Sequence, residues 1–311
     1  MKLQARSFRS PTDLAPMRQL LMVGSQADIS GSYIHPGWLD LEMFFPPDEQ
    51  VMHRNLRLWE DVRKDPPALA AWAIYMHHEG SFDLFVHPTL YGTLLHESLM
   101  DDFMVWAEAR AREAGLKQLW PFWAMDYDKT LERLMKARGF NIVQEDPAPP
   151  LFERTLDDLP LIRLPEGYTV QGVRNLEDGR LRARVNHTAF KMKVNWETYS
   201  ADYALFIRSA VYDGERDLFV RSPDGQGASA CTIWFDPVNR VGMFEPVGTR
   251  PDFQGKSLGK AVMAEGLRRM KAAGMQRAIV GFDPDNAAAR GLYSALGFRA
   301  SCYYTVARKA L

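Results

Sequence analysis

The stretch "RPDFQGKSLGKAV", residues 250 to 262, is rich in glycine and basic residues and stands where a helix could begin. Residues 255 to 257, Gly-Lys-Ser, are also the last three letters of an ATP-binding P-loop. A P-loop needs a second glycine five positions before the one that precedes the lysine, and here that position is Arg250. Pro251 in addition removes a backbone N–H from a loop that would have to offer N–H groups. The sequence therefore argues against an ATP site, and the neighbouring elements must decide which ligand the loop binds.

The loop stands in a regular series of predicted elements. Residues 240–249 have the β-branched and aromatic content of a strand, and residues 257–274 carry apolar side chains at helical spacing. Residues 275–282 then predict a short apolar strand, residues 283–298 a second helix, and residues 299–309 a closing strand. The predicted order is strand, phosphate-type loop, helix, strand, helix, strand.

The first half of the chain contains a weaker version of this series. Residues 81–86 predict a strand, and after a proline a helix runs to Gly115. A strand-like run at 116–125 and a helix at 126–140 follow, and this helix ends in Gly-Phe as the helix at 283–298 does. Two copies of one unit are indicated.

Length and linker composition indicate the same division. With 311 residues, 46% of them hydrophobic, the chain has enough apolar material for two cores. Residues 145–170 contain five prolines and several acids, which is typical of a linker that could also lend a strand to the first domain. We predict domains at residues 1–158 and 159–311.

Charge and cysteine usage restrict the partners and the compartment. A net charge of −1 supplies no overall basic field for nucleic acid or an anionic membrane, so we expect neither partner. The two cysteines, Cys231 and Cys302, have no metal-ligand spacing; we interpret them as buried hydrophobic residues in a reducing compartment. No signal peptide or membrane-length apolar run is found, which predicts a cytoplasmic protein.

The second half resembles the GNAT superfamily of acetyl-CoA-dependent N-acyltransferases. The similarity covers roughly residues 165–311 and rests on a strand ending at proline, a Gln-x-x-small-x-Gly loop that opens a helix, and a later Asn-x-x-Ala-x-x-x-Tyr that ends in Gly-Phe. The resemblance implies an α/β (α+β) fold with two GNAT-like domains, each a mixed, mostly antiparallel sheet flanked by helices. The family loop has glycine where this chain has Ser257, a residue that tolerates a positive φ less well.

By this resemblance, acetyl-CoA is the co-substrate and no metal is needed. Backbone N–H groups at a helix N-terminus can hold a pyrophosphate. The strand before the loop is implied to bond the pantetheine arm and polarise the thioester, and the motif asparagine, also a candidate helix cap, to contact CoA. The implied CoA-binding residues are Val247, Gly248, Thr249, Gln254, Gly255, Lys256, Ser257, Leu258, Gly259, Lys260 and Asn286.

Two residues are implied to move protons. Tyr293 matches the family tyrosine that protonates the departing thiolate. With a pKa of about 10 it is protonated at neutral pH and so has a proton to give, although it is a weaker acid than a thiol with a pKa of about 8.5. The glutamate that some members place five residues before the motif asparagine is Gly281 here, so we assign the base to Glu245 on the preceding strand. An exposed or ion-paired strand carboxylate is an equal reading of Glu245, and Tyr293 could serve packing alone. Asp283 and His187 are weaker candidates.

The first half resembles the same fold without its chemistry. Aligned on the proline, its loop is Tyr91 to His96 and lacks both motif glycines, while Asp128 and Met135 replace the asparagine and the tyrosine. We predict a non-catalytic domain that packs against the second. Trp120, Phe122 and Trp123 could line a substrate cleft, although three such aromatics are more often core residues.

The predicted function is transfer of an acetyl or short acyl group from acetyl-CoA to a primary amine of a small molecule, by direct attack in a ternary complex. A non-catalytic acyl-CoA sensor and a protein or peptide N-acetyltransferase are the alternatives. The tandem arrangement is similar to that of mycothiol synthases, which does not identify the acceptor, and a homodimer is left open.

Overall fold

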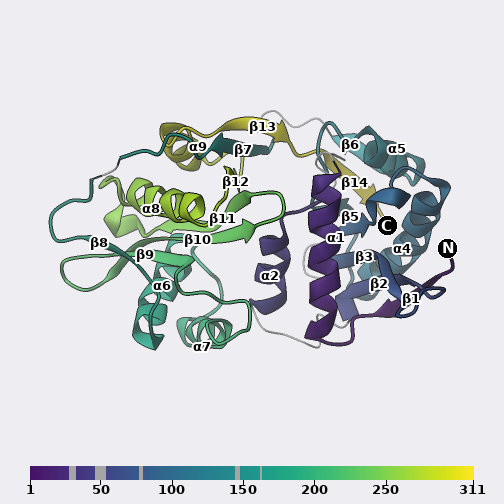
Figure 1. The fold of residues 1–311 in the computed structure, drawn as a ribbon, viewed down its shortest axis with the longest axis horizontal. Helices are drawn as coiled ribbons and strands as arrows, with labels where there is room; N and C mark the ends of the chain where they lie inside the picture. Colours follow the sequence, from purple (N-terminus) through teal and green to yellow (C-terminus); the bar gives the residue numbers. More distant parts are fainter. Residues whose placement is uncertain (28–32, 46–53, 77–79, 144–147, 162) are drawn as a thin grey trace. The chain divides into compact units, whose positions relative to one another are not determined.

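A computed structural model describes the chain except for residues 28–32, 46–53, 77–79, 144–147 and 162 (Figure 1). The chain forms two compact units. Unit 1 consists of Met1–His35, Glu49–Pro150 and Cys302–Leu311, and unit 2 of Pro36–Asp48 and Leu151–Ser301. Each unit therefore contains residues from more than one stretch of the chain.

Unit 1 is built on one seven-stranded sheet in the order β1-β2-β3-β4-β5-β14-β6. Strands β4 and β5 run parallel, while β1–β2, β2–β3, β3–β4, β5–β14 and β14–β6 pair antiparallel. The strands are β1 (Leu3–Ser7), β2 (Leu56–Asp61), β3 (Ala68–Met76), β4 (Ser81–Val86), β5 (Gln118–Pro121), β6 (Asn141–Val143) and β14 (Val306–Ala310). The helices are η1 (Pro11–Asp13), α1 (Leu14–Gln26), η2 (Pro88–Leu90), α4 (Leu94–Glu113) and α5 (Lys129–Ala137).

Unit 2 contains a second seven-stranded sheet in the order β13-β7-β12-β11-β10-β9-β8. Strands β11 and β12 run parallel, and β7–β12, β8–β9, β9–β10 and β10–β11 pair antiparallel. The strands are β7 (Pro150–Thr155), β8 (Thr169–Gly172), β9 (Asp217–Arg221), β10 (Gly227–Asp236), β11 (Val241–Thr249), β12 (Arg277–Gly281) and β13 (Arg299–Tyr303). The helices are α2 (Pro36–Phe44), α6 (Leu176–Ala189), α7 (Trp196–Phe206), η3 (Pro251–Phe253), α8 (Leu258–Ala272) and α9 (Ala287–Ala295).

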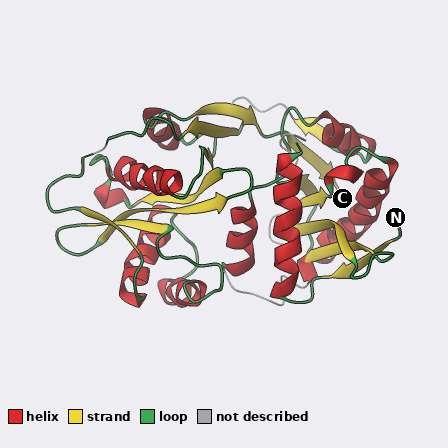
Figure 2. Ribbon diagram, viewed as in Figure 1, coloured by secondary structure: helices red, strands yellow, loops and turns green. Residues whose placement is uncertain are grey.

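These two sheets, each flanked by helices, confirm the predicted fold class (Figure 2). In unit 2 the alternation of strand side chains divides the core into two layers. Leu218 and Val220 of β9 join the cluster under α8, whereas Phe219 between them packs with Val185 of α6. Helices α8 and α6 therefore cover opposite faces of the sheet.

Strands β11 and β12 stay paired over a short distance and then separate. The parallel ladder joins Val241, Gly242 and Met243 to residues 277–279, and among the described residues no β11–β12 pair follows Met243. On its other side β11 stays paired with β10 as far as Thr249, across an irregularity in register between Cys231 and Ile233. The second half of β11 thus has an edge that β12 does not cover.

Two sequence-based expectations about the strands are wrong. The linker contributes its strand β7 to the sheet of unit 2 and not to the first domain. Phe152 of this strand packs in the core of unit 2. The closing strand expected at 299–309 is two strands, β13 in the sheet of unit 2 and β14 in that of unit 1. Both errors concern pairing with segments far away in the sequence, which local patterns do not encode.

Two further expectations concern the cysteines and a membrane-spanning helix. Cys231 and Cys302 are buried free thiols, as interpreted. Among the described residues, no helix is both long and apolar enough to cross a bilayer.

Candidate active site

The loop between β11 and α8 has the backbone shape of an anion site. Gly255 has a φ of +78° and Ser257 a φ of +60°, so the serine adopts the left-handed conformation that glycine would adopt more easily. Within the described part of the chain, the N–H groups from Gly255 to Lys260 have no hydrogen-bond acceptor, and Ser257 makes no side-chain cap. These free N–H groups at the positive end of a helix dipole fit the pyrophosphate of CoA.

Side chains of the loop leave this backbone accessible. Gln254 donates from Nε2 to the carbonyl oxygen of Thr249 at 3.4 Å. The Lys256 ammonium lies over the rings of Phe253 and Tyr168, 5.3 and 5.9 Å from their centroids. Tyr168 is a neighbour that the sequence did not point to. Lys256 adds a positive charge to this loop, and such a charge would stabilise bound phosphate oxygens.

Two glycines of the predicted set lie where a larger residue would be tightly packed. A Cβ on Gly259 would lie 3.2 Å from Thr249 Oγ1, and a Cβ on Gly248 would lie 3.1 Å from Ala189 and 3.2 Å from the ring of Phe190. Gly259 therefore lets α8 approach the end of β11, and Gly248 lets the end of α6 cross the strand. The approach of Ala189 and Phe190 was not predicted, because nothing local in the sequence signals it.

The uncovered edge of β11 carries the residues assigned to the pantetheine arm. Val247 and Gly248 pair with β10 on one side, and the hydroxyl of Ser229 on β10 donates to the Gly248 carbonyl at 3.1 Å. Thr249 Oγ1 lies 2.8 Å from Ser229 Oγ. The strand is thus held firmly from β10, while its other edge offers backbone groups to an extended ligand.

Glu245 lies on this half of β11 and is partly buried. Burial raises the pKa of its carboxyl to about 7. Its backbone carbonyl accepts a hydrogen bond of 2.7 Å from the indole N–H of Trp234 on β10. A partly buried carboxyl with a pKa near neutrality suits a general base, and its partial burial argues against the reading as a fully exposed carboxylate.

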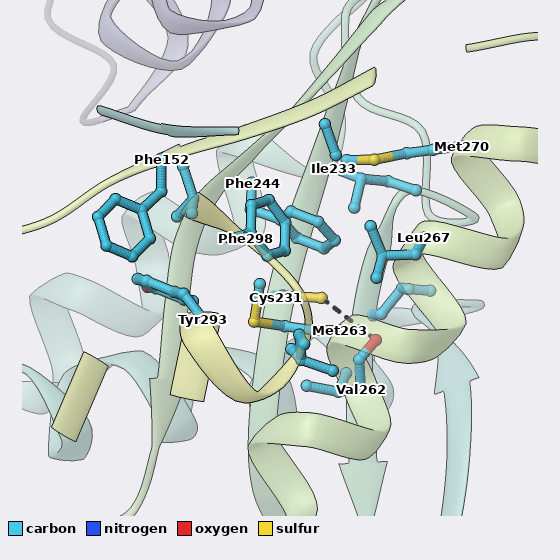
Figure 3. Close-up of a cluster of buried hydrophobic side chains, with 14 of the residues drawn as sticks. Phe152, Cys231, Ile233, Phe244, Val262, Met263, Leu267, Met270, Tyr293 and Phe298 are labelled. Atoms are coloured by element: carbon cyan, nitrogen blue, oxygen red, sulfur yellow. Dashed lines mark hydrogen bonds between the residues drawn. The ribbon is translucent and has the colours of Figure 1, made fainter. Parts of the chain in front are cut away.

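Tyr293 lies on α9 in the core of unit 2, with only 5% of its surface exposed. Figure 3 shows its ring in the cluster with Phe152 and Phe298, and the ring of Phe298 is 6.2 Å away. Burial, and after it the negative charge of Glu245, raises the pKa of the phenol above its ordinary value. The hydroxyl therefore stays protonated at neutral pH.

Asn286 is the N-cap of α9, and its Oδ1 accepts from the N–H of Ala289 at 3.0 Å. Asp283 accepts from the N–H of Asp285 at 2.9 Å. His187 on α6 lies 2.9 Å from the Val194 carbonyl oxygen through Nε2, and its ring packs against neighbouring aromatics. Each of these residues has a local structural role, and the CoA contact of Asn286 stays a prediction.

Most of unit 2 is similar to known acetyltransferases. Residues 181–298 match the model of the acetyltransferase (GNAT) family. The chain is 30% identical over 141 residues to a mycothiol acetyltransferase of Streptomyces coelicolor, which covers 45% of this chain and 46% of that protein. A mycothiol acetyltransferase of Streptomyces scabiei is 25% identical over 94% of this chain and 92% of its own. The strongest of these sequence matches thus spans about half of its relative.

Solved structures show the same fold over nearly the whole chain. A tandem GNAT protein from the clavulanic acid biosynthesis pathway superposes with a TM-score of 0.67 at 14% identity, covering 99% of this chain and 98% of that one. A GCN5-related N-acetyltransferase from Sphaerobacter thermophilus gives 0.61 at 20% identity, with coverages of 99% and 95%. At these identities the likeness speaks for the fold.

Proposed function

We propose that this chain, which belongs to the GNAT superfamily of acetyltransferases, transfers an acetyl group from acetyl-CoA to a primary amine of a small molecule, with unit 2 as the catalytic unit. The observation that carries the proposal is the uncapped start of α8 beside the uncovered edge of β11. Free N–H groups at the helix start and a free strand edge are complementary to a ligand that has a phosphate end and an extended amide arm.

Residues of unit 2 then have separate tasks. The N–H groups from Gly255 to Lys260 hold the pyrophosphate, and the edge of β11 from Val247 to Thr249 aligns the pantetheine arm and polarises the thioester carbonyl. Acetyl-CoA supplies the activated acyl group. No metal ligand set is invoked for any of these tasks.

Proton transfer is assigned to two side chains on neighbouring elements. The ionised form of Glu245 accepts the proton that the acceptor ammonium must lose before its nitrogen attacks. Its pKa of about 7 leaves a substantial fraction ionised at neutral pH. Tyr293, which holds its proton, donates it to the departing thiolate. On collapse of the intermediate the nitrogen loses its second proton to solvent, and the Tyr293 phenolate regains a proton from solvent, so the protons balance.

One of the two arguments for a non-catalytic acyl-CoA sensor is weakened. The sensor alternative rested on the missing glutamate at Gly281 and on Ser257, and Ser257 adopts the left-handed conformation that the loop requires. The relatives are named as acetyltransferases of mycothiol and not of a protein, which favours a small acceptor over a peptide.

The direct test is turnover of acetyl-CoA with a panel of small primary amines, followed by release of free CoA. We expect at least one amine to stimulate release far above the rate of hydrolysis without amine. Tight acetyl-CoA binding without stimulation by any amine, including short amine-containing peptides, would favour the sensor.

A further inference from the structure

Unit 1 contains a pocket of its own where β4 and β5 separate. The two strands pair only at Ser81 and Phe82, and beyond this point the pocket opens between them and the helices α4 and α5. Its cavity is small, about 10 Å³, which is room for one group of the size of a water molecule or an ammonium head. Its wall includes Asp83, Phe85, Tyr91, His96, Trp123 and Asp128.

Asp83 is the unusual member of this wall. It is 5% exposed, and its Oδ1 accepts from the backbone N–H of Trp123 at 2.8 Å. Its Oδ2 has no hydrogen-bond partner among the described residues. A buried carboxyl oxygen without a partner is costly, and it marks a place where a donor from a ligand would be stabilised.

The other ionisable groups of the wall have partners and add no positive charge, while the indole N–H of Trp123 also has no hydrogen-bond partner among the described residues. Asp128 accepts from the N–H of Leu131 at 2.9 Å and from the Tyr91 hydroxyl at 2.5 Å. His96 Nδ1 accepts from the N–H of Gly92 at 3.1 Å, and burial lowers the pKa of this imidazole to about 4, so it is neutral at pH 7. No Lys or Arg is among the described residues that line the pocket.

We propose that this pocket binds the ammonium head of a small organic cation, with Asp83 Oδ2 as its hydrogen-bond acceptor. The carboxyl of Asp128 and the aromatic side chains of Phe85, Tyr91 and Trp123 also line the pocket, and aromatic rings attract cations most strongly where water is excluded. The site lies within unit 1 and does not depend on the acetyl transfer proposed for unit 2.

Binding is coupled to the protonation of Asp83. Burial raises the pKa of this carboxyl well above its ordinary value, which favours the neutral acid when no cation is bound. When an ammonium ion binds, Asp83 loses its proton to solvent and the carboxylate pairs with the cation. The groups that face it are Asp128, Tyr91 and His96, and the neutral imidazole does not compete with the cation.

The test is calorimetric titration of the full chain with n-butylammonium, with n-butanol as the neutral probe of similar shape. We expect saturable binding of n-butylammonium and no binding of n-butanol. The measured heat of binding should also depend on the ionisation enthalpy of the buffer, because the buffer takes up the proton, at most one per site, that Asp83 releases. Asp83→Asn keeps the side-chain size and should weaken binding by at least about ten-fold, since a buried cation would lose its charge partner. Glu245→Gln, which removes the candidate base of unit 2, should leave this binding unchanged.

Several outcomes would overturn the proposal. These are no binding of n-butylammonium at millimolar concentrations, equal binding of n-butanol, wild-type affinity in Asp83→Asn, or loss of binding in Glu245→Gln alone. Circular dichroism establishes whether Asp83→Asn folds. Should that variant not fold, the proton release measured on the wild type decides, because binding without it shows that Asp83 does not ionise on binding.

Discussion

Both units contain a loop that leads from a strand through a short 3-10 helix into a long helix, and the two loops treat their N–H groups in opposite ways. In unit 1, Gly92 has a φ of +74°, but its N–H is taken by His96 Nδ1, and Thr93 caps α4 by accepting from the N–H of His96 at 3.4 Å. In unit 2, Gly255 has nearly the same φ, yet Ser257 caps nothing. Unit 1 satisfies its helix start with its own side chains, whereas unit 2 leaves its helix start open to a ligand.

The following helices make the same point. Asp128 caps α5 at φ −78° and ψ 77°, and Asn286 caps α9 at φ −81° and ψ 78°. Each helix is followed, two residues after its end, by a glycine with a positive φ, and the next N–H donates to the backbone carbonyl oxygen of Met135 in unit 1 and of Tyr293 in unit 2. The backbone geometry is the same at this point, while the side chain is the thioether of Met135 in unit 1 and the phenol of Tyr293 in unit 2. The two units therefore share this backbone frame and differ in the side chains it carries.

The largest effect expected is that of Tyr293→Phe. Removing the hydroxyl should lower kcat by about 10²-fold with little change in acetyl-CoA affinity, since only the general acid is lost. Tyr293→Met, which copies Met135 of unit 1, should fold and be at least as impaired. Steady-state kinetics with a responsive amine measure both. Normal turnover by Tyr293→Phe would make this residue a packing residue, like its counterpart.

Glu245→Gln should change the pH profile as well as the rate. Because only the ionised carboxylate accepts a proton and its pKa is about 7, kcat/KM of the wild type should rise as pH rises through 7. The variant should lose this limb, with activity reduced by about 10-fold or more near pH 8 and partial recovery at high pH, where the amine is already neutral. The control is Asp83→Asn, which removes the buried acid of β4 in unit 1 and should keep the wild-type profile. An unchanged profile in Glu245→Gln would assign the base elsewhere.

Ser257→Asp and Leu94→Asp compare the two helix starts directly. Aspartate tolerates the left-handed conformation of residue 257, but its charge opposes a pyrophosphate at the free N–H groups, so CoA affinity should fall by about ten-fold. Leu94 is 83% exposed and follows Thr93, the residue that caps α4, so the same charge there should leave CoA affinity unaltered. Calorimetry of both variants gives the answer, and equal losses would show that the two loops are not functionally different.

The smallest effect expected is on stability. Thr93→Ala removes a side-chain cap and should lower the free energy of unfolding of unit 1 by about 1 kcal/mol. Ser257→Ala removes no cap bond and should change the stability of unit 2 by less than about 0.5 kcal/mol. Urea denaturation followed by circular dichroism measures the difference. A larger loss in Ser257→Ala would mean that this serine holds the loop together.

Local features of the fold were predictable from the sequence. Apolar spacing and the stop at Gly274 predicted α8, and Asn286 was a candidate cap for α9. The partners of β7 and the division of residues 299–309 between two sheets were not predictable, because strand pairing over long separations leaves no local pattern. For the same reason, nothing showed that α2 belongs to unit 2.

The candidate site was predictable where a motif stands in one stretch. The loop from Gln254 to Lys260 could be identified, but the burial that raises the pKa of Glu245 depends on how distant residues pack around β11. The pocket at Asp83 was missed. Its one signal was an acid between the apolar Phe82 and Leu84, in a strand that buries both Phe82 and Asp83.

The measurement that tests the central claim most directly is the number of CoA molecules bound per chain. Calorimetric titration of the wild-type protein with CoA should give one site per chain, and Ser257→Asp should weaken that site while Leu94→Asp leaves it intact. Two equivalent sites, or a single site weakened by Leu94→Asp and not by Ser257→Asp, would contradict the assignment of CoA binding to the open helix start of unit 2.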